Sequence, residues 1–282
     1  MAYVEDEIAS QPGCWGRVPA VQVAAGGERV AVVGCGTSWF VAMAYAGLRE
    51  GAGRGRTDAF AASEALLDRD YDRVVAITRS GTTTEVVDLL SKATQPTTVI
   101  TGVADSPAAE HADETIVLDF ADERSVVQTR FATTALALLR TSLGEDLSQA
   151  ITDAERALDV DVDRWATVEQ VTFLGRGWTV GIAHEAALKM REAAGVWTES
   201  YPAMEYRHGP ISIAQPNRLT WVFGQPPLGL PEQVAATGAE FVHSDLDPMA
   251  HLVVAQRLAV AVARARGLDP DRPRNLTRSV IL

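Results

Sequence analysis

The sequence predicts an α/β protein in which two similar halves each carry a parallel sheet. Short runs rich in β-branched residues alternate with helix-length stretches, which implies parallel strands joined by crossover helices on both faces of a sheet. The order of strand, glycine-flanked turn and helix also occurs twice along the chain. Gly34 and Gly36 match Gly175 and Gly177 at a constant offset, which indicates an internal duplication.

Runs of apolar residues place the individual elements. The two halves begin with strands at 29–33 and 171–174, each followed by its turn and helix. Further strands are predicted at 73–78, 97–101 and 115–119 in the first half and at 219–223 and 240–243 in the second. An apolar stretch at 248–266 predicts a single helix. We expect the halves to join near 145–168, which is itself helical in pattern.

The composition is that of a globular protein and excludes a disordered or fibrous chain. The 282 residues are 47% hydrophobic and 22% charged, so a large core can be buried. With 37 acidic and 25 basic side chains, the formal net charge is −12. This charge argues against general binding to nucleic acid or to an anionic membrane, but it permits a small anionic ligand in a local pocket.

The cysteine content, the start of the chain and the apolar stretches together predict the cellular compartment of the protein. Cys14 and Cys35 are the only cysteines, too few for a disulfide framework or a set of zinc ligands. Residues 1–8 are acidic where a secretory signal needs a basic start. The stretch 252–265 is interrupted by polar residues and is shorter than the ~20 residues that span a bilayer. We therefore expect a cytoplasmic protein without a membrane or nucleic-acid partner.

The loop after the strand at 73–78 predicts a phosphate site. Ligands of open parallel sheets bind at the carboxyl ends of strands, where helix N-termini offer unpaired N–H groups. Five hydroxyl groups, one arginine and one glycine lie between the strand residue Ile77 and the next helix. They are Thr78, Arg79, Ser80, Gly81, Thr82, Thr83 and Thr84. The alternative is that these hydroxyls cap the helix and Glu85 completes a capping box.

The first glycine-flanked turn, at 34–38, offers two more hydroxyl groups. Thr37 and Ser38 occupy the same kind of strand-to-helix turn and could reach the same ligand from a neighbouring strand. The turn lacks the third glycine of a dinucleotide fingerprint, and no acidic residue ends the following strand, which excludes nicotinamide binding. A tight turn without a ligand is the equally open alternative.

A helix of the second half predicts a site for proton transfer. Spacings of four and three residues place Glu185, Lys189 and Glu192 on one helical face, where an ammonium can orient a carboxylate. Lys189 is one of only two lysines in the chain. His208 follows in a loop closed by Gly-Pro. The alternative for the Glu/Lys pair is an exposed surface ion pair.

Together these motifs resemble the SIS (sugar isomerase) domain family, in particular the isomerase part of glucosamine-6-phosphate synthase and stand-alone amino-sugar-phosphate deaminases. The resemblance covers nearly the whole chain. The segments that carry it are Glu7-Ile8, Gln11-Pro12, 34–38, Ser80-Gly81, Thr83, 123–134, 173–177, 185–192, Tyr201-Pro202, 207–210, 273–276 and Ser279-Val280.

The resemblance implies two tandem SIS subdomains, each a five-stranded parallel sheet in an α-β-α layer. It divides the chain into an N-terminal lead-in (1–20), a phosphate-binding first subdomain (21–150), a second subdomain with the catalytic helix and histidine loop (151–270), and a C-terminal tail over the active site (271–282). It also implies a homodimer in which the histidine loop serves the partner subunit's active site.

The resemblance further implies roles for individual residues acting on a phosphorylated sugar. Glu192 would move the proton between C1 and C2, Lys189 and Glu185 would position it and the sugar, and His208 would assist ring opening. The substrate-binding set is Thr37, Ser38, Thr78, Arg79, Ser80, Thr83, Val126 and Arg278. No metal or organic cofactor is implied.

Two departures from the family pattern shape the predicted function. The lead-in at Glu7 to Pro12 begins near the start of the chain, so we expect no glutamine-hydrolysing domain. Arg278 stands where the synthase has its Schiff-base lysine, and arginine is a poor imine former.

We therefore predict a phosphosugar isomerase/deaminase that converts an amino-sugar phosphate such as glucosamine 6-phosphate to a ketose phosphate and ammonia. The alternatives are an aldose–ketose phosphosugar isomerase, a deglycase, and a non-catalytic regulatory protein that binds a sugar phosphate.

Overall fold

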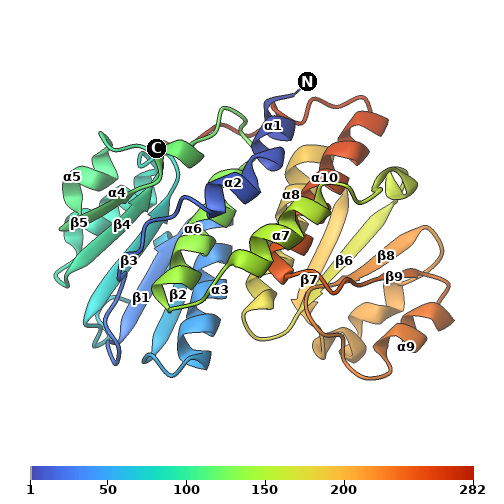
Figure 1. Cartoon of the computed structure of the whole chain (residues 1–282), viewed down its shortest axis with the longest axis horizontal. Coiled ribbons are helices and arrows are strands. Elements are labelled where there is room, and N and C mark those ends of the chain that lie inside the picture. The colour runs from blue at the N-terminus through green and yellow to red at the C-terminus, as the bar shows by residue number, and fades with distance from the viewer. Residues whose placement is uncertain (1) are drawn as a thin grey trace. The chain divides into compact units, whose positions relative to one another are not determined.

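The computed structural model describes residues 2–282, which form two compact units (Figure 1). The five-stranded unit consists of Gly13–Arg124, Gln128–Leu147 and Thr277–Leu282. The four-stranded unit consists of the residues up to Pro12, Ser125–Val127 and Ser148–Leu276. The chain therefore passes between the units more than once, and the last six residues return to the unit that holds the first sheet.

The five-stranded unit is built on a parallel sheet with helices on both faces. The strands, in the sheet order β2-β1-β3-β4-β5, are β1 (Val30–Gly34), β2 (Thr57–Ala61), β3 (Arg73–Thr78), β4 (Thr97–Thr101) and β5 (Glu114–Val117). The helices are α2 (Gln11–Trp15), α3 (Thr37–Gly51), α4 (Thr84–Lys92), α5 (Pro107–His111) and α6 (Arg130–Ser142), with short 3-10 turns η1 (Ala62–Glu64) and η2 (Asp119–Ala121).

The core of this unit explains why its central strands were predictable. β1 and β4 are buried at every position, and β3 at every position but its first, as expected when helices cover both faces of a parallel sheet. Alternate side chains of a strand, such as Ala31 and Val33 of β1, belong to one core cluster with Leu89 and Leu90 of α4 and Ala108 of α5. Helices α3 and α6 contact each other.

The four-stranded unit has a second parallel sheet, in the order β7-β6-β8-β9. Its strands are β6 (Gln170–Gly175), β7 (Trp197–Pro202), β8 (Arg218–Val222) and β9 (Glu240–Val242). Its helices are α1 (Tyr3–Ala9), α7 (Ser148–Ala157), α8 (Thr179–Ala194), α9 (Leu230–Ala236) and α10 (Pro248–Ala265), with 3-10 turns η3 (Asp163–Trp165), η4 (Glu205–His208) and η5 (Pro210–Ile213).

The prediction of five strands in the second sheet is wrong. After β9 the chain enters α10, whose residues are nearly all buried, and no strand follows among the described residues. The segment beyond α10 contains Pro270 and Pro273, and proline cannot donate a hydrogen bond to a strand ladder. β9 is therefore an edge strand, and one side of this sheet remains open.

Two strands, β2 and β7, were not placed from the sequence. Both are edge strands whose residues are mostly only partly buried, so they carry charged residues within short runs and lack a continuous apolar pattern. The predicted parallel pairing of the other strands is confirmed.

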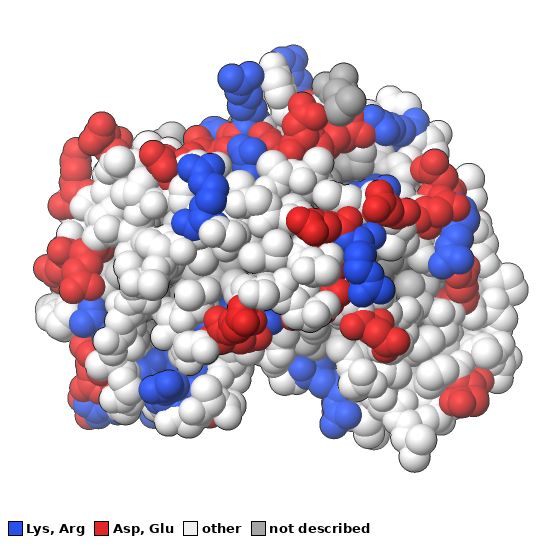
Figure 2. Space-filling view, viewed as in Figure 1, with Lys and Arg blue, Asp and Glu red and all other residues white. Residues whose placement is uncertain are grey.

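Surface charge and helix length are relevant to the prediction that the protein has no nucleic-acid or membrane partner. On the face shown in Figure 2, basic side chains are interspersed with acidic ones and form no continuous patch. Within residues 2–282, no helix is both long enough and apolar enough to cross a bilayer.

Candidate functional site

The predicted phosphate loop lies at the carboxyl end of β3, in the turn that leads to α4. Thr78 and Ser80 are buried, and the Ser80 hydroxyl accepts hydrogen bonds from the amide and the hydroxyl of Thr82 at 3.2 and 3.0 Å. Thr83 is the N-cap residue of α4, yet its side chain makes no capping hydrogen bond. A role of Thr83 as a simple helix cap is therefore not supported.

Gly81 fixes the shape of this loop. Its φ of +66° is in the left-handed region, and a Cβ there would lie 2.1 Å from the hydroxyl of Ser106. Its carbonyl accepts a hydrogen bond from the amide of Ala108, so α5 packs directly against the loop. Only glycine satisfies both the backbone angle and the close approach.

Arg79 points into the protein interior. Its side chain is 1% exposed, with one guanidinium nitrogen 3.9 Å from the Glu123 carboxylate and the other donating to the carbonyl of Arg278 at 3.0 Å. This arrangement places a permanent positive charge directly behind the phosphate loop. The guanidinium is held by Glu123 and by the C-terminal tail.

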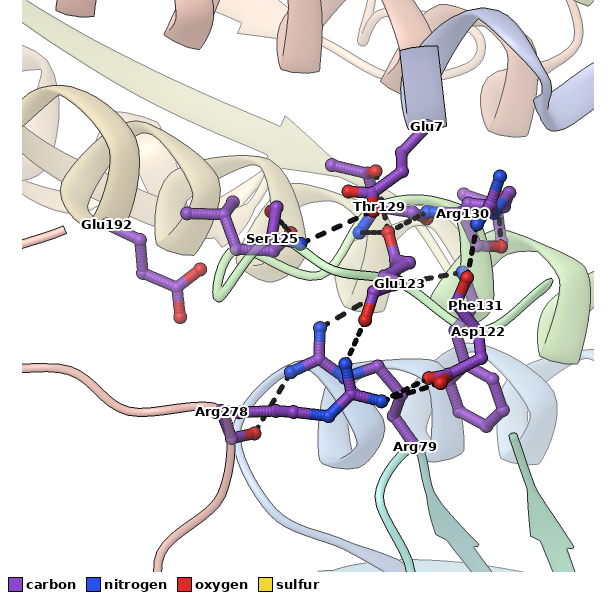
Figure 3. Close-up of polar contacts among 12 residues, drawn as sticks. Glu7, Arg79, Asp122, Glu123, Ser125, Thr129, Arg130, Phe131, Glu192 and Arg278 are labelled. Carbon is purple, nitrogen blue, oxygen red and sulfur yellow. Dashed lines mark hydrogen bonds and ion pairs between the residues drawn. The ribbon is translucent and has the colours of Figure 1, made fainter. Parts of the chain in front are cut away.

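Glu123 is the centre of this network, as Figure 3 shows. Its buried carboxylate accepts from the amide and hydroxyl of Thr129 at 2.7 and 2.8 Å, from the amide of Arg130 at 2.7 Å and from the amide of Phe131 at 3.2 Å. These amides belong to the start of α6, where helix N–H groups lack intrahelical partners. Glu123 thus joins the N-terminus of α6 to Arg79.

The C-terminal tail, residues 277–282, lies along the phosphate loop. The Thr84 amide donates to the Val280 carbonyl at 3.1 Å, and the Thr82 and Ser279 hydroxyls are 3.0 Å apart. The amide of Leu282 donates to the Thr84 hydroxyl at 3.0 Å. The tail therefore takes up several donors and acceptors of this loop.

Arg278 holds this tail in place through an acidic partner. One of its guanidinium nitrogens lies 2.5 and 2.7 Å from the two carboxylate oxygens of Asp122, and the other donates to the Glu123 carbonyl. Figure 3 shows Arg278 beside Arg79, with Asp122 and Glu123 as their acidic neighbours. Arg278 was predicted from the sequence to bind substrate, whereas its partner Asp122 was not predicted.

The remaining predicted sugar-binding residues are divided between the units. Thr37 and Ser38 form the first turn of α3 and are buried, and a Cβ on Gly34 would lie 2.7 Å from Ser38. Burial and the charge of Glu85 raise the pKa of the Cys35 thiol in this turn. Val126 belongs to the four-stranded unit, where its amide donates to the Asp271 carbonyl at 3.2 Å.

The predicted proton-transfer residues lie together on α8. The Lys189 ammonium is 2.5 Å from the Glu192 carboxylate and 3.6 Å from that of Glu185. Lys189 is 1% exposed and Glu185 is 2% exposed, whereas the side chain of Glu192 is 19% exposed. The alternative of an exposed surface pair is wrong, because the lysine is buried between its two carboxylates. Glu192 is the member of the cluster that can meet a ligand.

His208 ends η4 and is exposed. Gly209, with φ of +130°, and Pro210 follow it. The preceding Arg207 holds the loop by donating to the side chain of Gln233 and to the Leu228 carbonyl, both at 2.6 Å.

The described residues include no group of three or more His, Cys, Asp or Glu side chains that could hold a metal ion. The functional candidates that sequence reasoning missed are Asp122 and the capping role of Glu123. The adjacent acidic residues before the helix at 130 were visible in the sequence, but their partners are distant along the chain.

Comparisons with known proteins agree with the fold. Residues 25–142 match the model of the SIS domain. The chain is 28% identical to a glutamine–fructose-6-phosphate aminotransferase (isomerizing) of Sulfurisphaera tokodaii, over 90% of this chain and 50% of the relative. A Xanthomonas campestris enzyme of the same name is 30% identical, over 90% and 52%. The chain spans about half the length of these relatives.

Three solved structures share the architecture. Glucosamine-6-phosphate deaminase from Thermotoga maritima has a TM-score of 0.87 at 23% identity, covering 100% of both chains. The C-terminal domain of the aminotransferase from Francisella tularensis has a TM-score of 0.82 at 22% identity, covering 96% of this chain and 98% of that one. Tagatose-6-phosphate ketose/aldose isomerase from Escherichia coli has a TM-score of 0.80 at 17% identity, covering 100% and 96%. At these identities the likeness establishes the fold.

Proposed function

We propose, from the premise that residues 25–142 of this chain belong to the SIS domain family, that the protein is a phosphosugar isomerase. We further propose that it acts as a deaminase on an amino-sugar phosphate such as glucosamine 6-phosphate. The observation that carries the proposal is the cluster on α8, where a buried lysine lies between two carboxylates and only Glu192 is accessible.

The cluster suits a carboxylate that takes a proton from carbon and returns it. A buried ammonium needs compensating negative charge, which Glu185 and Glu192 supply. Lys189 in turn fixes the position of the Glu192 carboxylate, and general acid–base catalysis requires such positioning. A carboxylate that was merely part of a surface ion pair would not need a lysine that is 1% exposed.

In this proposal the hydroxyls of Thr78, Ser80 and Thr83 hold the phosphate, with the N-terminus of α4 and the charge of Arg79 behind them. Thr37, Ser38 and Val126 line the sugar. Arg79 acts through the loop, because its guanidinium is engaged by Glu123 and by the tail. Arg278 holds the tail and forms no imine with the substrate, because its guanidinium is paired with Asp122 and a guanidinium is a poor imine former.

The reaction is balanced by one water molecule. Glu192 removes the proton from C2 of the open-chain amino aldose, and the electron pair moves toward C1 while the carbonyl oxygen takes up a proton, which gives the enolamine. Glu192 then returns its proton to C1 while the nitrogen lone pair forms the C2=N bond and one N–H proton is released. The resulting imine at C2 is hydrolysed, which gives the ketose phosphate and ammonia. His208 assists ring opening, and we propose that it does so for the partner subunit of a homodimer.

Incubation with glucosamine 6-phosphate tests the reaction, with ammonia and fructose 6-phosphate followed separately. Both products in equal amounts support the deaminase. An unsubstituted aldose phosphate and an N-substituted amino-sugar phosphate are assayed in parallel. Turnover of the first without ammonia identifies a plain aldose–ketose isomerase, and release of the substituted amine from the second identifies a deglycase. Binding of glucosamine 6-phosphate without turnover of any of these substrates identifies a regulatory protein.

The role of Glu192 has its own test. Glu192→Gln should lower kcat by at least ~100-fold with little change in KM, because the proton acceptor is lost while the phosphate contacts remain. Glu232→Gln, an exposed position on α9, is the matched control and should leave kcat unchanged. Normal turnover by Glu192→Gln would remove this residue from the mechanism.

A further inference from the structure

A cavity of about 160 Å³ lies in the four-stranded unit, outside the residues assigned to the reaction. It is bordered by β8, the edge strand β9, the first half of α10 and the turn η3 (elements β8, β9 and α10 in Figure 1). Because this sheet ends at β9, no further strand covers this side of the sheet within the described residues. The cavity belongs to an open sheet edge.

The side chains that line this cavity are basic or neutral, and the Glu240 carboxylate accepts a hydrogen bond from the indole of the lining Trp165 at 2.8 Å. Arg164, His243 and His251 line it, with the hydroxyl-bearing Ser244, and no Asp or Glu of the described chain does. The chain as a whole has a formal net charge of −12. A lining with one arginine, two imidazoles and no carboxylate favours an anion.

Buried polar atoms of the lining lack partners. Nε2 of His243, Nδ1 of His251 and Nε1 of Trp221 are inaccessible and have no hydrogen-bond partner among residues 2–282. Trp221 is fully buried and His251 is 3% exposed. Unsatisfied buried donors and acceptors are costly, so native proteins retain them mainly where a ligand, ion or water uses them.

Aromatic contacts hold these groups in fixed positions. The His251 ring stacks on Trp221, with centroids 4.8 Å apart and planes at 28°. The guanidinium of Arg164 lies 3.9 Å from the centroid of the Trp165 ring, and Trp165 in turn packs edge-on against Trp221 at 5.4 Å. The site is thus built before any ligand arrives.

We propose that this cavity binds a small oxyanion of carboxylate or phosphate size, held by Arg164, His243 and His251. The volume accommodates such an ion but is below the ~300 Å³ of cavities that take drug-sized ligands. The proposal does not depend on the function assigned to α8 or to the phosphate loop, and its test involves no turnover.

Binding should be coupled to proton uptake. Burial, with a smaller contribution from His243, lowers the pKa of His251 to about 3, so the empty site holds a neutral ring at pH 7. His243 from the loop after β9 and Arg164 from η3 are the titratable or charged side chains that line the cavity with it, and Trp221 from β8 is neutral. A bound anion supplies the missing negative charge and favours the imidazolium.

The test uses acetate as the probe, with chloride at equal ionic strength as the blank and inorganic phosphate as a second anion. NMR spectra of the isotope-labelled full chain follow the indole N–H of Trp221 and the ring of His251. These signals are assigned by their loss in Trp221→Phe and His251→Gln. We expect a saturable shift of both signals and tighter binding as the pH falls from about 8 to 6, because protonation of the imidazole favours the anion-bound state.

Two variants with exposed side chains keep the test decisive if the buried substitutions impair folding. Arg164→Gln should weaken binding severalfold, whereas Arg54→Gln in the five-stranded unit should leave it unchanged. A shift of the Trp221 and His251 signals with acetate alone identifies a carboxylate site. A shift of the same signals with phosphate alone identifies a phosphate site. No shift of either signal with either anion, or the same affinity in Arg164→Gln, would overturn the proposal.

Discussion

Glu123→Gln should destabilise the five-stranded unit by about 3 kcal/mol. The carboxylate is inaccessible and lies 3.9 Å from the equally buried guanidinium of Arg79. At this separation the attraction is about 4 kcal/mol with an effective dielectric constant of 20. The amide side chain of the variant keeps the shape of the carboxylate and one acceptor oxygen. Its N–H groups, however, face the arginine or the helix amides, which are hydrogen-bond donors themselves. Loss of one partner of a buried pair costs about 3–5 kcal/mol, because the other charge stays buried and unpaired.

Urea unfolding followed by circular dichroism measures this effect as a shift of the midpoint at constant slope. Glu110→Gln, on the exposed surface of α5, is the matched control and should stay within about 0.5 kcal/mol of the parent protein. The double variant Arg79→Gln with Glu123→Gln should cost less than the sum of the single changes, because it removes both charges. A loss below about 1 kcal/mol, or strictly additive losses, would refute this explanation.

Three further changes follow from the same structure. His251→Gln should remove the part of the free energy of unfolding that is lost in acid. The pKa of His251 is lower in the folded than in the unfolded protein, so this contribution is complete above about pH 6.5 and is lost towards pH 3 at up to about 1.4 kcal/mol per pH unit. Equal pH slopes of stability in the parent protein and the variant would contradict this. Gly81→Ala should lower the free energy of unfolding by at least about 1 kcal/mol, because of the positive φ at this position and the close approach of a Cβ to Ser106. Gly51→Ala, at an open helical position, should raise it by up to about 1 kcal/mol. Thermal unfolding compares the two variants. Arg278→Ala should speed hydrogen exchange at the amides of Thr84 and the tail while changing global stability by less than about 1 kcal/mol, because the ion pair is partly exposed; unchanged exchange would show that Arg278 does not hold the tail.

Local patterns in the sequence predicted the central strands and the shared face of α8. β3 and β4 begin and end at the predicted residues, because helices cover both faces of a parallel sheet and nearly every position is buried. Spacings of three and four residues likewise placed Glu185, Lys189 and Glu192 together, because helix geometry depends only on neighbouring residues.

Whether such a face is buried depends on what packs against it. The Glu185–Lys189 pair has the same spacing in an exposed helix as in a covered one, and only the tertiary structure showed that the lysine is 1% exposed. The edge strands β2 and β7 were missed for a related reason, since a strand with one neighbour is only partly buried and carries a weak pattern.

Pairing between distant segments is the other feature that only the tertiary structure decided. Arg278 contacts Asp122 across 156 positions of the sequence, and Arg79 meets Glu123 only because the turn after β3 and the start of α6 adjoin in the folded unit. The sequence by itself determined the central strands, the spacing along α8 and which chemical groups are available. The choice of partner for each charge was decided by packing, because an ion pair depends on the distance between side chains in space and leaves no regular spacing along the chain.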